Sequence, residues 1–141
     1  MDLIKNYLDY AVLGLLGFMS FLMLWFVIER YLYFARLDLG RFDSIDELEV
    51  DLTRNLTTIG TIGANAPYIG LLGTVLGILI AFFDMGQSGV IDTNTIMLGL
   101  ALALKATALG LIVAIPSIVF YNALLRRVDV LKVRWRKEHA G

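Results

Sequence analysis

The sequence predicts an all-α membrane protein that forms a single domain with three transmembrane helices. Hydrophobic residues make up 58% of the 141 residues and charged residues only 18%, whereas about a quarter of the residues in a soluble domain are charged. The apolar residues also gather in three blocks, which is typical of membrane spans. We expect spans at about residues 11–28, 66–83 and 96–121, a loop at 29–65 and a tail at 122–141.

The first block, Ala11 to Ile28, contains 18 residues and no charge. A spanning helix needs about 20 apolar residues, within a range of about 17 to 25. A cleaved signal peptide is the alternative, but the block is longer than the usual hydrophobic region of such a peptide. It is also followed by "WFVIER" rather than by small residues. We therefore expect a retained span.

The second block, Ala66 to Phe83, also has 18 residues without a charge, and the third has 26 residues whose one charge is Lys105. Lysine and arginine in the flanks predict the orientation. The head holds only Lys5, whereas the first loop and the tail together hold ten positive residues: Arg30, Arg36, Arg41, Arg54, Arg126, Arg127, Lys132, Arg134, Arg136 and Lys137. We expect the N-terminus outside and the C-terminus in the cytoplasm.

The segments outside the membrane show helical patterns. Residues 43–61 read as one amphipathic helix that begins with a Ser44–Glu47 capping box and runs towards the second span, with Gly60 and Gly63 as weak points. Its apolar stripe consists of Ile45, Leu48, Leu52, Leu56 and Ile59. In the tail, Val128, Leu131 and Trp135 form a second stripe. We expect the second and third helices to project beyond the membrane and to pack together there.

The tail is strongly basic. Six positive charges next to a span are ordinary determinants of topology, and contact with anionic membrane lipid is a further interpretation. A nucleic-acid partner is not expected.

Small residues recur at helical spacing on the second and third spans. The two sets are Ala66, Gly70, Thr74, Gly77 and Ala81, and Ala103, Thr107, Gly110 and Ala114. Such faces let helix backbones approach closely in lipid. One interpretation is helix packing alone, with each threonine bonded to its own backbone. The other is that several copies form a ring, in which Thr74 and Thr107 line a lumen and offer hydroxyls to a proton or a partner.

Lys105 lies about 160° around its helix from Thr107. A charge deep in a span costs about 2.5 to 3.5 kcal/mol, which makes a functional role the default hypothesis. The alternatives are a lysine that snorkels and one that pairs with an acid. No acid lies inside a predicted span, so we expect such an acid on another polypeptide, unless Asp84 or Asp92 folds in. Lys105 is expected to face a neighbouring subunit or lipid.

Two segments carry a family resemblance. "NAPYIGLLGTVLGILIAF" (65–82) and "ALKATALGLIVAIPSIVFYN" (103–122) resemble the two signature spans of the ExbB/TolQ/MotA family, and "WFVIER" (25–30) resembles the end of the first span in its ExbB and TolQ branch. The resemblance covers all three spans and their order. Within these motifs we expect helix-packing positions at Gly70, Gly73, Gly77, Gly110, Pro67 and Pro116.

The resemblance implies a proton-driven motor subunit of the bacterial inner membrane. Members form a pentamer around the single transmembrane helices of an ExbD-like partner, whose aspartate carries the proton, and proton flow energises TonB and outer-membrane receptors. The pore threonines of the family match Thr74 and Thr107. Many relatives carry a glutamate where this chain has Leu102, so the partner is expected to supply the titrating carboxylate.

Other classes fit less well. A TolQ-like subunit of the Tol-Pal system and a non-conducting scaffold are the alternatives, and the loop at 29–65 is short for a flagellar stator of the MotA type. An enzyme is not expected, because the spans hold no carboxylate pair and no nucleophile with a base. We expect no cofactor and no metal. The absence of cysteine excludes disulfides and thiolate zinc sites.

Overall fold

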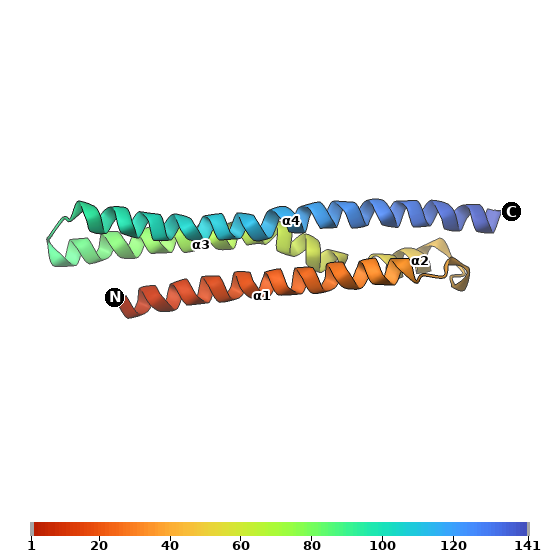
Figure 1. The fold of residues 1–141 in the computed structure, drawn as a ribbon, viewed down its shortest axis with the longest axis horizontal. Coiled ribbons are helices and arrows are strands. Elements are labelled where there is room, and N and C mark those ends of the chain that lie inside the picture. Colours follow the sequence, from red (N-terminus) through yellow and green to blue (C-terminus); the bar gives the residue numbers. More distant parts are fainter. Residues whose placement is uncertain (1, 141) are drawn as a thin grey trace.

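The computed structural model describes residues 2–140 as an elongated bundle of helices (Figure 1). The elements are α1 (Asp2–Ala35), η1 (Leu39–Arg41), α2 (Ile45–Leu52), α3 (Leu56–Ser88) and α4 (Thr93–Ala140). Three of these helices are long and apolar enough to cross a membrane. The predicted fold class, an all-α protein with three transmembrane helices, is confirmed.

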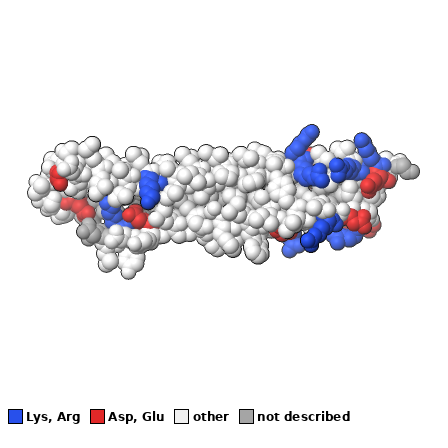
Figure 2. Space-filling model, in the orientation of Figure 1, with Lys and Arg blue, Asp and Glu red and all other residues white. Residues whose placement is uncertain are grey.

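The two ends of the bundle differ. The N-terminus lies near the turn between α3 and α4, and the C-terminus lies at the opposite end (Figure 1). We call residues 84–96 the turn end, and residues 29–55 with 122–140 the basic end, where most of the lysines and arginines gather (Figure 2). The 48 residues of α4 span about 70 Å, more than twice the roughly 30 Å of a bilayer core. The predicted projection of the third helix beyond the membrane is confirmed.

The turn end is shorter than expected. The predicted loop between the second and third spans is reduced to residues 89–92, because α3 and α4 continue past their apolar stretches. Gly89 ends α3 in a left-handed conformation (φ 69°), which glycine adopts without a steric penalty. The Asp92 carboxylate accepts from the Asn94 N–H at 3.2 Å. It also accepts from the Thr95 hydroxyl at 2.8 Å, and so caps the start of α4.

The single helix predicted at residues 43–61 is wrong. The chain forms α2 and then α3, with Asn55 between them in a left-handed conformation (φ 68°). Gly60 and Gly63 lie inside α3 and do not interrupt it. The predicted start is confirmed, since the Ser44 hydroxyl accepts from the Glu47 N–H at 3.1 Å. The stripe is also buried as expected, at Leu48, Leu52, Leu56 and Ile59.

At the basic end, α2 packs against the tail of α4. Leu124, Val128 and Leu131 of α4 are buried in the same apolar cluster as the α2 stripe. The Trp135 indole N–H donates to the Phe42 carbonyl at 3.2 Å, and the Lys132 ammonium lies 3.3 Å from a Glu49 carboxylate oxygen. The predicted apolar stripe of the tail is therefore the surface that holds α2.

Candidate functional site

The second and third spans touch through their smallest residues. A Cβ added to Gly70 would lie 2.5 Å from the Ala106 carbonyl oxygen, and one added to Gly110 would lie 2.6 Å from the Ala66 carbonyl oxygen. Both distances are shorter than any side chain tolerates, so glycine is required at both positions. The backbones of α3 and α4 are in direct contact here, which is the geometry that small residues permit in lipid.

The two small faces meet each other within one chain. Gly77 lies against Ala103, since an added Cβ would come within 3.2 Å of the Ala103 methyl group. Gly73 faces both Ala106 of α4 and Val12 of α1, at 3.0 and 3.2 Å by the same measure. Gly73 is thus the point at which all three long helices converge.

Thr74 and Thr107 lie in the middle of this contact. The Thr74 hydroxyl is hydrogen-bonded to the Thr107 hydroxyl and donates to the Ala103 carbonyl at 2.7 Å. A hydroxyl has one proton to donate and two lone pairs. Because Thr74 uses its proton on Ala103, Thr107 is the donor of the bond between the two hydroxyls. The lone pairs of the Thr107 oxygen then remain available to an external donor.

Burial distinguishes the two threonines. Thr74 is 6% exposed and is enclosed between α3 and α4, whereas Thr107 is half-buried. Within one chain Thr107 is therefore the accessible end of the hydroxyl pair. The structure brings the two predicted site residues together, and places Thr74 behind Thr107 rather than beside it on an open surface.

The two prolines lie inside the long helices, Pro67 in α3 and Pro116 in α4. A proline inside a helix has no N–H for the carbonyl four residues earlier, which here belongs to Gly63 and Ile112. Next to Pro116, the buried Ser117 hydroxyl donates to the Val113 carbonyl at 2.7 Å. Both helices continue through their prolines.

Lys105 faces away from the threonine pair. It lines a cavity of about 70 Å³ together with Asp9 and Val12 of α1 and with Gly73 of α3. Asp84 and Asp92 line a different cavity at the turn end, with Lys5. Asp9 is thus the carboxylate residue that lines the same cavity as Lys105, whereas Asp84 and Asp92 line the other one.

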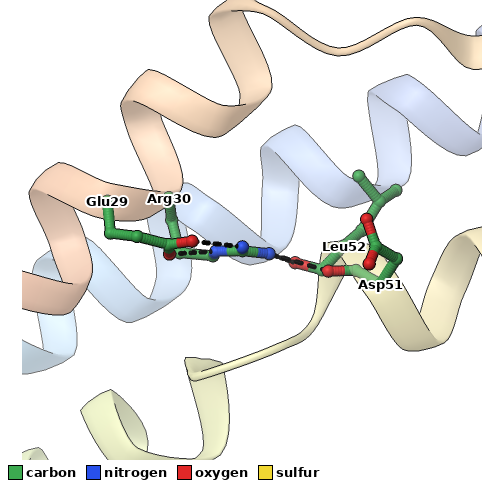
Figure 3. Close-up of polar contacts among 4 residues, drawn as sticks. All are labelled: Glu29, Arg30, Asp51 and Leu52. Carbon is green, nitrogen blue, oxygen red and sulfur yellow. Dashed lines mark hydrogen bonds and ion pairs between the residues drawn. The ribbon is translucent and has the colours of Figure 1, made fainter.

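Arg30 is a structural residue that helical periodicity does not reveal. Its side chain is 2% exposed, and Figure 3 shows it between the Glu29 carboxylate and the end of α2. It donates to both Glu29 oxygens at 2.5 Å, to the Asp51 carbonyl at 2.7 Å and to the Leu52 carbonyl at 3.3 Å. The Tyr33 ring packs 4.4 Å from the guanidinium carbon.

These contacts stabilise the end of α2, where the chain turns before α3. The Asp51 and Leu52 carbonyls lie where α2 ends and lack the N–H donors four positions later that a continuous helix would supply. Arg30 donates to both of them, and the Asp51 carbonyl also accepts from the Arg54 N–H at 3.4 Å. A cation at the end of α2 also matches the helix dipole. Glu29 lies just past the charge-free stretch 11–28. Its hydrogen bonds from Arg30 hold the pKa of its carboxyl below the usual value, against the opposing effect of partial burial.

Comparisons with known proteins agree with the geometry of the spans. Residues 41–137 match the model of a family described as the MotA/TolQ/ExbB proton channel family. The chain is 57% identical over 136 residues to a biopolymer transport protein ExbB of Helicobacter pylori (strain J99), an alignment that covers 96% of this chain and 94% of the relative. It is 52% identical over 139 residues to a biopolymer transport protein ExbB of Aquifex aeolicus, with 99% and 94% covered.

Proposed function

This chain belongs to the MotA/TolQ/ExbB proton channel family, and from that membership we propose that it is a proton-channel subunit of the bacterial inner membrane. In this proposal several copies, five by resemblance to the family, surround the single transmembrane helices of ExbD-like partner chains. The proton motive force drives protons through the complex, and the resulting motion energises TonB and transport across the outer membrane. The names of the relatives, biopolymer transport proteins, favour this role over a TolQ-like one.

The observation that carries the proposal is the hydroxyl pair of Thr74 and Thr107. Thr74 is satisfied by the Ala103 carbonyl and orients Thr107, whose free lone pairs suit a donor such as a protonated carboxyl group. A partner aspartate that arrives protonated can donate to Thr107, and one that has lost its proton cannot. The pair therefore distinguishes the two charge states of a proton carrier, in a span that has no titratable group on the same face.

The residues around the Thr74–Thr107 pair favour proton movement that is coupled to work over free leakage of protons through an open pore. Gly70, Gly77 and Ala103 close the α3–α4 contact around Thr74, which is buried within a single chain. A proton that crosses 100 mV releases about 2.3 kcal/mol, and this energy is available for work only if protons do not leak. We propose that the path opens at the surface of Thr107, where copies of the chain and the partner helix meet.

The proposed orientation follows from the charges. The basic end, residues 29–55 and 122–140, lies in the cytoplasm, where its arginines and lysines contact anionic lipid headgroups. The turn end and the N-terminus lie in the periplasm.

Reconstitution of the purified complex tests the function. The full chain, co-expressed with an ExbD-like single-span protein, is expected to purify as a ring with that protein and to acidify liposomes under an imposed gradient. The chain without the partner, and liposomes without protein, serve as controls and should show at least about tenfold slower acidification. A complex of the expected mass that moves no protons under any gradient would support the alternative, a membrane scaffold in which the threonines only pack.

A further inference from the structure

Two opposite charges share one cavity between the first and third long helices. Asp9 of α1 and Lys105 of α4 line this cavity, and Gly73, Leu102 and Ala106 supply apolar or small parts of its wall. No ion pair within 4.0 Å joins Lys105 to a carboxylate among the side chains of residues 3–140. The cavity volume of about 70 Å³ leaves room for a few water molecules between the two groups.

The position of the cavity along the bundle places both charges inside the apolar region. Gly73 and Leu102 belong to the apolar stretches of α3 and α4, and Asp9 lies beside them although it precedes the predicted first span. Sixteen residues separate Lys105 from Tyr121, the inner end of the third apolar stretch, which corresponds to about 24 Å along the helix. A bilayer core about 30 Å thick therefore contains Lys105 on the side nearer the turn end.

Other charged groups near this level have different neighbours. Lys5 precedes Asp9 by one helical turn, but it lines the cavity at the turn end with Asp84 and Asp92. Charged residues within a membrane pair with one another or with carbonyls, because lipid offers no other partner. Among the residues that the structure describes, Asp9 is the only acidic residue that lines the cavity with Lys105, and Lys105 is the only basic one.

We infer that Asp9 and Lys105 form a membrane-embedded ion pair, bridged by water in the cavity, that holds α1 against α4 on the side of α4 away from Thr107. At the same level, Gly73 packs α3 against α1 and α4. The Asp9–Lys105 pair lies on one side of this three-helix contact, and the threonine pair lies on the other side. The role of the Asp9–Lys105 pair is to position α1, and it carries no proton. The inference concerns contacts within this chain and does not depend on the proposed function.

Cross-linking in membranes tests the contact. The natural chain has no cysteine, so Asp9→Cys with Lys105→Cys introduces the only thiols. A short bifunctional thiol reagent is expected to join them within one chain, which gives a monomer of altered mobility on a denaturing gel. Tyr10→Cys with Lys105→Cys is the matched control, because Tyr10 is 74% exposed on another side of α1. Equal yields for the two pairs, or dimers alone, would overturn the inference.

A charge exchange tests the energetic coupling. Asp9→Asn and Lys105→Met each leave one charge without a partner in lipid and should reduce the amount of assembled, heat-resistant protein. The exchange Asp9→Lys with Lys105→Asp should recover it, with a coupling of at least about fivefold in the ratio of assembled to unassembled protein. An exchange variant no better than the worse single variant, while the cysteine pair also fails to cross-link, would leave Lys105 as a snorkelling lysine.

Discussion

Gly70→Ala is expected to destabilise the pairing of α3 and α4 by about 2 to 3 kcal/mol, the upper part of the usual range for overpacking. The new methyl group would lie 2.5 Å from the Ala106 carbonyl oxygen and 3.1 Å from the Cα atoms of Gly110 and Thr107. All three neighbours are backbone atoms, so the helices must move apart. That movement also separates the hydroxyls of Thr74 and Thr107, and we expect proton flux to fall with stability.

The same substitution elsewhere provides the control. Alanine stabilises a helix by about 0.5 to 1 kcal/mol relative to glycine, which opposes the packing loss at Gly70. At Gly17 of α1 no atom lies within 4 Å of an added Cβ, so Gly17→Ala should leave stability unchanged or raise it. The measurement is the temperature at which the purified complex loses its elution peak. If Gly70→Ala behaves like Gly17→Ala, the close α3–α4 contact is wrong.

Arg30→Met is expected to loosen the basic end and to destabilise the chain by about 2 to 3 kcal/mol. The substitution leaves the Asp51 and Leu52 carbonyls and the Glu29 carboxylate without their donor. Removal of one partner from a fully buried ion pair costs about 3 to 5 kcal/mol. The smaller value is expected here because Glu29 is 37% exposed and water can solvate it.

Hydrogen exchange locates this effect. Amides of α2 should exchange faster in Arg30→Met, whereas amides in the middle of α3 and α4 should keep their protection. Arg36→Met is the control, because Arg36 is an exposed arginine directly after the end of α1, and its loss should change neither the stability nor the exchange of α2. Unchanged exchange in α2 would show that Arg30 does not hold the end of this helix.

Much of the fold follows from local patterns in the sequence. Three apolar stretches predict three long helices, Ser44 predicts the start of α2, and the stripes of the loop and the tail predict which sides are buried. These predictions succeed because each depends on residues three or four positions apart on one helix. The small faces of the second and third spans are likewise visible as a pattern.

Other features depend on contacts between distant residues. At the break near Asn55, carbonyls at the end of α2 are satisfied by Arg30, which lies 25 positions earlier than Asn55 and on another helix. The proximity of Asp9 to Lys105 requires α1 to begin well before its apolar stretch and to lie against Gly73. Residue spacing also does not reveal which helix packs against each small face. Nor does it show that Thr74 donates to the Ala103 carbonyl and so leaves the Thr107 hydroxyl accessible.

The most direct test of the account is the rate of proton flux through the reconstituted complex when Thr107 is replaced by valine and by serine. Valine has nearly the same shape as threonine but no hydroxyl, whereas serine keeps the hydroxyl. We predict that Thr107→Val assembles normally and conducts at least about tenfold more slowly, and that Thr107→Ser keeps most of the wild-type rate. Wild-type flux in a fully assembled Thr107→Val complex would contradict the role of the hydroxyl pair in the proton path.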